Sequence, residues 1–155
     1  MKQTVRRKAR AFTLIELVIV IAIIGLLAAT AIPRFIDLRV QAADASRDGV
    51  IGGVRSGIMV KVADNLKSGA GTIIPSQLDG LSPPVTCSST KVCFDTVLTD
   101  GVTDSIWSRD TLTGGGGCDT AGADSVYTFT PPAGAGSAKS YGYDNATGRM
   151  VQCVN

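Results

Sequence analysis

Glu16 is the residue whose type and position most directly suggest chemistry, because it is the only glutamate among the 13 acidic residues. It lies near the start of an apolar stretch, Phe12 to Pro33, that contains no other charged residue. A carboxylate in hydrocarbon is costly near the centre of a membrane helix, which makes it a functional candidate. Thr13 and Glu16 also fit the S/T-x-x-E capping box, a purely local explanation. The two interpretations can hold together.

No catalytic site is predicted. The chain has no histidine, so the commonest general base and metal ligand is missing. Serine and aspartate are abundant, but no nucleophile has a recognisable base. We therefore expect a structural or binding protein that is not an enzyme and that requires no cofactor.

The apolar stretch has the length of a membrane span. A helix over Phe12 to Ile32 is about 31 Å long, close to the bilayer core of about 30 Å. Five basic residues and no acidic one precede it: Lys2, Arg6, Arg7, Lys8 and Arg10. The positive-inside rule then holds the start in the cytoplasm and sends the rest of the chain across. Loss of these five charges would change the formal net charge from +2 to −3, so the basic character of the whole chain does not argue for nucleic acid binding.

A conventional secretory signal is the competing interpretation. Ala29-Thr30-Ala31 is an A-x-A sequence after a basic start and an apolar run, and cleavage there would release a soluble domain. The run is longer than the usual 7 to 15 or so apolar residues, and it contains Glu16. The membrane-helix interpretation is therefore favoured.

The sequence RKARAFTLIELVIVIAIIGLLAATAIP, residues 7–33, resembles the class III signal of type IV pilins and type II secretion pseudopilins. The resemblance implies that a prepilin peptidase removes residues 1–11 by cutting between Ala11 and Phe12 and that the new Phe12 amine is N-methylated. The family usually has Gly before the cut, whereas this chain has the small residue Ala11.

The resemblance also gives Glu16 a role between molecules. It implies that the Glu16 carboxylate pairs with the Phe12 amine of a neighbouring copy and guides its docking into a filament. Pro33 lacks the N–H of an interior helical residue and should kink or open the helix. Gly25 lies eight residues before Pro33 and is a second weak point of the helix. In filaments of the resembled family, the stretch between such a Gly and Pro can unwind, so Gly25 to Pro33 is the expected extensible segment.

After Pro33 an amphipathic helix is expected over residues 34–66, with two apolar faces. We expect one face to contact neighbouring subunits and the other to pack on the chain's own sheet, although one twisted core contact explains the pattern equally well. The first face contains Phe35, Leu38, Ala42 and Ala45, and the second contains Ile51, Val54, Ile58, Val62 and Leu66.

The predicted fold class is α+β, pilin-like: a long kinked N-terminal helix, membrane-spanning in its first half, packed on a small antiparallel β-sheet. The domains are the leader 1–11, the transmembrane and filament-core helix 12–33, the helix half 34–66, and a globular β domain 67–155. Strands are expected at residues 91–98, 125–130, 139–143 and 149–153, with Ile106 and Trp107 on a further short one. Residues 144–148 suit a hairpin turn.

Four cysteines, Cys87, Cys93, Cys118 and Cys153, lie in the exported part, where disulfides form. Three pairings are possible. We favour Cys87 with Cys93, and Cys118 with Cys153, which resembles the disulfide-bounded C-terminal region of many type IV pilins. A zinc site competes, but the spacings contain no C-x-x-C pair.

Calcium is a weaker interpretation. Major pseudopilins have a calcium site in the region that here contains Asp95, Asp100, Asp104 and Asp110. The spacing does not match an EF-hand loop, so solvated loop acids are favoured.

The resemblance implies a homo-oligomer, a helical filament of identical subunits that is served by prepilin peptidase and an assembly machinery. The subunit would sit in the inner membrane before assembly and then in an extracellular pilus. The alternatives are a pseudopilin of a type II secretion system, in a periplasmic pseudopilus, or a minor pilin that binds DNA or a surface ligand. No run of basic residues with interleaved aromatics supports nucleic acid binding.

Intact-mass measurement with N-terminal sequencing of the mature protein recovered from cells tests the processing. We expect a chain that starts at N-methylated Phe12. A chain that starts at Ile32 would instead establish the secretory signal and remove Glu16 from the mature protein. The same spectrum, taken with and without reductant, counts the disulfides.

Overall fold

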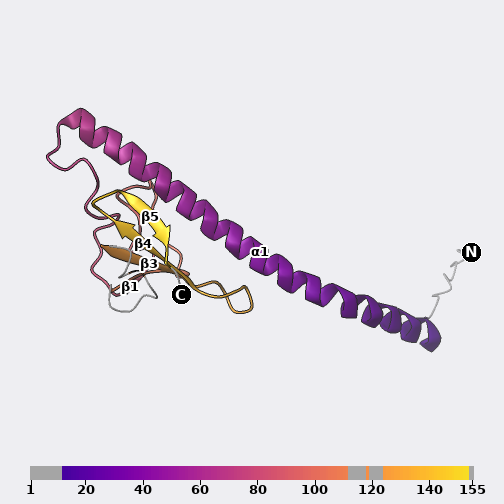
Figure 1. The fold of residues 1–155 in the computed structure, drawn as a ribbon. Helices are drawn as coiled ribbons and strands as arrows, with labels where there is room; N and C mark the ends of the chain where they lie inside the picture. Colours follow the sequence, from indigo (N-terminus) through magenta and orange to yellow (C-terminus); the bar gives the residue numbers. More distant parts are fainter. Residues whose placement is uncertain (1–11, 112–117, 119–123, 154–155) are drawn as a thin grey trace, which may run out of the picture. The chain divides into compact units, whose positions relative to one another are not determined.

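One long helix and a five-stranded antiparallel sheet make up the fold in a computed structural model of the chain (Figure 1). The structure describes residues 12–111, 118 and 124–153. It divides into two compact units, Met1–Leu38 and Arg39–Asn155. The predicted α+β class, with a long N-terminal helix and an antiparallel sheet, is confirmed.

Helix α1 spans Leu14–Ser68 without interruption. It ends two residues later than expected, where Gly69 adopts a left-handed φ of 69°. The N–H of Ala70 then donates to the carbonyl of Asn65 at 3.0 Å, which satisfies an acceptor of the last turn. The helix is therefore closed by a glycine that begins the connection to the sheet.

The strands follow one another in the sheet in chain order, and every neighbouring pair is antiparallel. They are β1 (Val85–Thr86), β2 (Trp107–Asp110), β3 (Ser125–Phe129), β4 (Lys139–Asp144) and β5 (Arg149–Gln152). The last three confirm the predicted strands, and the short strand expected at Trp107 is confirmed as β2, with Ile106 just before it. Strand β1 was not predicted.

The strand predicted over residues 91–98 is wrong. Phe94 has a left-handed φ of 60°, and its carbonyl accepts the N–H groups of Val97 and Leu98 at 3.1 and 2.9 Å. These bonds close a turn, so only two isolated bridges remain in this range, Lys91 with Ser88 and Cys93 with Val102. The apolar run is buried because it packs on the core rather than because it belongs to the sheet.

Aromatic side chains of the sheet form the core of the second unit together with three α1 residues. Ile51, Val54 and Ile58 are at most 4% exposed, as the predicted second face requires. They share one buried cluster with Phe94, Trp107, Tyr127, Phe129, Tyr141 and Tyr143. Val62 is partly buried against this cluster, but Leu66 is 59% exposed. The predicted stripe therefore ends one turn early.

The predicted β4–β5 hairpin is confirmed and is closed by Asp144. Its Oδ1 accepts the N–H of Ala146 at 2.8 Å, and its Oδ2 accepts the Thr147 hydroxyl at 2.6 Å. Bonds to the ionised carboxylate, that of Thr147 above all, lower the pKa of Asp144. Gly148 completes the turn with a φ of 70°.

Gly57 determines how closely α1 approaches the turn at residues 94–98, where a strand was predicted. A Cβ at this position would overlap the carbonyl oxygen of Val97. Gly52, one and a half turns earlier, has nothing within 4 Å of the equivalent position. Comparing alanine at Gly57 with alanine at Gly52 therefore distinguishes a steric requirement for glycine from the ordinary cost of glycine in a helix.

Replacement of Gly57 by Ala should destabilise the protein by about 1–3 kcal/mol, because the added methyl group forces α1 away from Val97. Gly52→Ala is the matched control and should stabilise by up to about 1 kcal/mol, because alanine favours the helix. Denaturant unfolding of the mature protein in detergent measures both. Equal effects of the two substitutions would show that the close approach is not required.

Candidate functional site

The first part of α1 exposes the residue types that normally fill a protein core. Sixteen large apolar side chains between Phe12 and Leu38 are exposed, from 44% at Val18 to 91% at Phe12. By length and composition α1 could cross a membrane, and its most apolar 18-residue window has a mean hydropathy of 2.7 and no buried residue. We call residues 12–38 the exposed apolar segment. Surfaces of this kind mark contacts with membranes or other proteins.

Glu16 forms the predicted capping box with Thr13. Its Oε2 accepts the Thr13 N–H and the Thr13 hydroxyl, both at 2.9 Å, while the Glu16 N–H donates to Thr13 Oγ1 at 3.3 Å. The carboxylate also lies at the N-terminal end of α1, where the helix dipole favours negative charge. Local contacts therefore fix the position of this carboxylate, and it stays exposed on the surface of α1.

The other predicted residues of this segment lie in different situations. Gly25 and Pro33 are both inside the continuous helix, so the kink and the extensible segment remain predictions about the filament. Ala11 and the rest of the leader lie outside the described residues. Phe12 is the first described residue and immediately precedes the capping box, so a new amine there would be close in sequence to Glu16.

The first predicted face of the later helix half is free within the chain. Phe35 is 64% exposed and Leu38 is 56% exposed, and Ala42 and Ala45 are also exposed. This face is therefore available to other molecules, while Ile51, Val54 and Ile58 hold the helix on the sheet.

A buried ion pair between Asp79 and Arg109 was not found from the sequence. Arg109 Nη1 donates to Asp79 Oδ1 at 2.6 Å and also to the Leu81 carbonyl, and Nη2 donates to Ser125 Oγ at 3.1 Å. Asp79 is 1% exposed and Arg109 is 5% exposed. The pair joins the 75–84 connection to strand β2. Alternate residues of a strand face the same side, so Arg109 lies on the same face of β2 as the buried Trp107. This alternation was the signal in the sequence that Arg109 is buried.

Tyr143 makes a second buried link to the same connection. Its hydroxyl donates to the Pro75 carbonyl at 2.6 Å. Burial, with the charges of Asp124 and Asp144 nearby, raises the pKa of Tyr143 to about 12. The phenol is therefore neutral at physiological pH and acts as a structural donor.

Both favoured cysteine pairings are present in the structure. Cys87 is bonded to Cys93 and Cys118 to Cys153, with Cα–Cα distances of 5.5 and 4.9 Å. The second disulfide fastens the residue that follows β5. Because all four sulfurs are paired, they do not form the alternative zinc site.

No three of the four aspartates considered for calcium, Asp95, Asp100, Asp104 and Asp110, form a group that could hold a metal ion. Asp95 and Asp100 are exposed, and Asp110 accepts the Ser108 hydroxyl at 3.3 Å. Among the residues that the structure describes, no group of three or more Asp, Glu, His or Cys side chains could hold a metal ion. The calcium interpretation stays a prediction that these residues do not test.

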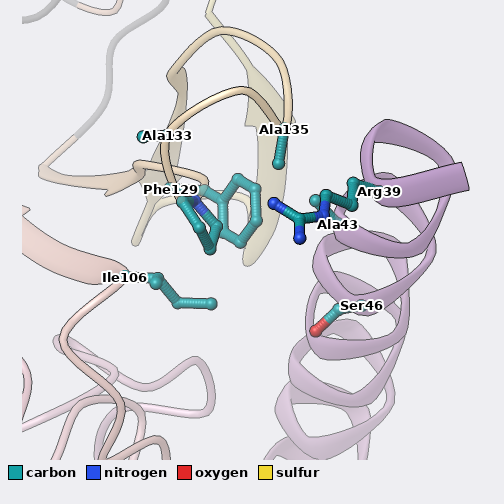
Figure 2. A pocket seen from close by; sticks show the side chains of 8 residues that line it. Arg39, Ala43, Ser46, Ile106, Phe129, Ala133 and Ala135 are labelled. Carbon is teal, nitrogen blue, oxygen red and sulfur yellow. The ribbon is translucent and has the colours of Figure 1, made fainter. Parts of the chain in front are cut away.

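An apolar groove of about 370 Å³ lies between α1 and the loop that follows β3. Figure 2 shows Arg39 of α1 extending toward the ring of Phe129, with Ala135 above and Ile106 below the opening. A single cation and few polar groups line it, and no nucleophile–base pair is present among the lining residues. This groove gives no indication of catalysis.

Comparison with known proteins finds similarity in the N-terminal part of the chain. Residues 6–32 match the family model of the prokaryotic N-terminal methylation motif. The match includes Phe12, Glu16 and Gly25 and ends just before Pro33.

The chain is similar to two curated proteins over part of its length. It is 57% identical over 49 residues to the type IV narrow pilus major component PilA5 of Thermus thermophilus, covering 32% of this chain and 42% of the relative. It is 49% identical over 63 residues to the type IV major fimbrial protein FimA of Dichelobacter nodosus, covering 39% of this chain and 35% of the relative. The chain thus matches less than half the length of each of these relatives. No solved structure matches it significantly.

Replacement of Asp79 by Ala should destabilise the second unit by about 3–5 kcal/mol, because Arg109 would remain buried without its counter-charge. Asp64→Ala removes an exposed aspartate of α1 and should change stability by less than about 0.5 kcal/mol. Denaturant unfolding of the mature protein in detergent compares the two. Similar small effects would show that the buried pair contributes little.

Proposed function

We propose that this chain, which has the prokaryotic N-terminal methylation motif and is similar to type IV pilus and fimbrial proteins over part of its length, is a structural subunit of a type IV pilus-like helical filament. The observation that carries the proposal is the exposed apolar segment with Glu16 at its start. A membrane can cover this surface before assembly, and neighbouring copies can cover it afterwards. The same side chains then serve as anchor and as filament core.

The energy available from this surface is large. Full burial of one Leu, Ile, Val or Phe side chain contributes about 1.5–3 kcal/mol. The sixteen exposed side chains could therefore contribute on the order of tens of kcal/mol per subunit. Lipid and packed helices are both apolar, so moving the segment from the membrane into a filament changes this burial free energy little. Directional contacts must then select the filament.

Glu16 supplies such a contact. We infer that its carboxylate, held in place by Thr13, pairs with the methylated Phe12 amine of a neighbouring copy. A charge pair removed from water is strongly orientation-dependent, and an unpaired buried charge is unfavourable. An incoming subunit would therefore be stable in one register only.

The partners and locations follow from this mechanism. Prepilin peptidase would remove the leader at Ala11, the subunit would wait in the inner membrane, and an assembly machinery would move it into an extracellular pilus. The similar proteins named above are pilus and fimbrial components, which favours a pilus over a type II secretion pseudopilus or a ligand-binding minor pilin. Those relatives are structural proteins, and no catalytic role is proposed.

Glu16→Gln separates the two roles of this residue. Glutamine keeps the S/T-x-x-E/Q capping box but has no charge, so filament yield should fall at least about tenfold if charge pairing selects the register. Glu16→Ala should abolish or sharply reduce filaments. Sheared filaments measured against membrane-inserted subunit provide the readout.

Thr13→Ala is the matched control, because it removes the hydroxyl of the capping box and keeps the carboxylate. It should assemble far better than the Glu16 variants. Normal filaments from Glu16→Gln, together with loss of filaments from Thr13→Ala, would show that Glu16 acts only as a helix cap.

A further inference from the structure

A shallow basic groove lies on one flank of α1, where the helix meets strand β5. It has a volume of about 350 Å³ and is lined by Arg55, Met59, Arg149 and neighbouring residues of β5. Arg55 donates from Nε and Nη2 to the Met150 carbonyl at 3.2 and 3.0 Å, which holds its guanidinium in place. Arg149 is exposed, and Met59 is 63% exposed. We call Arg55, Met59 and Arg149 the basic flank.

A second groove lies on the other flank of α1, where the helix meets residues 95–99. It has a volume of about 200 Å³ and is lined by Lys61, Asp64 and Asp95, among others. Asp64 and Asp95 are exposed, as is Asp100 next to the groove. We call Asp64, Asp95 and Asp100 the acidic flank. Lys61 is the one cation in the lining of this groove, so the acidic flank has an excess of negative charge.

The helical repeat separates these flanks. Arg55 and Met59 are four residues apart and share one side of α1. Gly57, which touches Val97, and Lys61 share another side, and Arg55 and Gly57 are about 200° apart at about 100° per residue. The two grooves therefore open on opposite sides of one helix.

Among the described residues, the charges on the two flanks form no ion pair, although Arg149 lies opposite Asp144 in the β4–β5 pair and its charge acts on that carboxylate. The ion pairs of the described residues join Arg47 to Asp44 and Asp48, and Arg109 to Asp79. None of them includes Arg55, Arg149, Asp64, Asp95 or Asp100. The monomer thus leaves cations on one side of α1 and anions on the other.

We propose that the basic flank of one subunit docks on the acidic flank of a second copy of this chain, next to it in the filament. Arg55 and Arg149 would then face Asp64 and Asp95 of the neighbour. The contact joins two different surfaces, so it is heterologous and does not close on itself, which is the kind of contact that builds a helical fibre. Complementary charge fixes orientation and suppresses wrong partners.

This inference rests on the proposed filament but concerns a different part of the subunit. The exposed apolar segment lies in residues 12–38, whereas both flanks belong to the unit that starts at Arg39. Glu16 would set the register of the filament core, and the flanks would set which sides of neighbouring globular units meet. The two contacts can therefore be broken separately.

Charge reversal on each flank tests the contact in cells that produce the full chain. Arg55→Glu/Arg149→Glu alone and Asp64→Arg/Asp95→Arg alone should each lower filament yield at least about tenfold, because like charges would meet at every repeat. Co-expression of the two variants should restore filaments, since each reversed flank then meets the opposite charge on the other variant. A chain with all four substitutions should also assemble.

Matched controls separate docking from folding. Lys91→Glu reverses an exposed charge in the Ser88–Lys91 turn, which lines neither groove, and should leave yield unchanged. Arg149→Glu alone keeps the Arg55–Met150 contact and should still reduce yield. Formation of both disulfides, measured by mass, checks that each variant folds.

Normal filaments from both double variants would overturn the inference while leaving the proposed function intact. Failure of the mixture and of the fourfold variant to assemble, with folding preserved, would also overturn it. If the unmodified chain forms no filaments, it is the proposed function that fails. The two failures are thus distinguishable.

Discussion

The structure depends on one unmet requirement: a long row of apolar side chains in α1 is left uncovered by the part of the chain that the structure describes. Residues 12–38 expose sixteen large apolar side chains, whereas Ile51, Val54 and Ile58 of the same helix are buried. One continuous helix therefore carries two surfaces with different partners. The first must be covered by lipid or protein, and the second is already covered by the sheet.

In the second unit, contacts within the chain hold α1 in place, so this part of the helix does not depend on lipid or on other subunits. Gly57 allows the helix to contact the Val97 backbone, and the aromatic core of the sheet closes over its buried face. The Asp79–Arg109 pair and two disulfides hold the loops that the short strands cannot hold. A small sheet with long connections needs such links, because its strands alone bury little surface.

Much of this arrangement was predictable from the sequence because the signals are local. The capping box of Thr13 and Glu16, the β4–β5 hairpin and the stripe through Ile58 depend on residues a few positions apart. The errors have non-local causes. Residues 91–98 have the composition of a strand, but Phe94 adopts a left-handed conformation and the run packs on the core as a turn. The partnership of Asp79 and Arg109 spans 30 residues, and the alternation in β2 that places Arg109 beside Trp107 does not identify the partner.

Buried and exposed charges of the second unit are treated differently. Where a charge is buried, as at Arg109 and Arg47, the chain supplies the counter-charge itself, because an unpaired buried charge is unfavourable. The exposed charges on the flanks of α1 are solvated by water and take part in none of the ion pairs of the described residues. A single exposed ion pair contributes only about 0–1 kcal/mol, so such charges add little to the fold of one subunit. In a fibre the same weak contact recurs at every subunit, and orientation matters more than strength. Charges of this kind are therefore better suited to select how subunits meet than to stabilise any one of them.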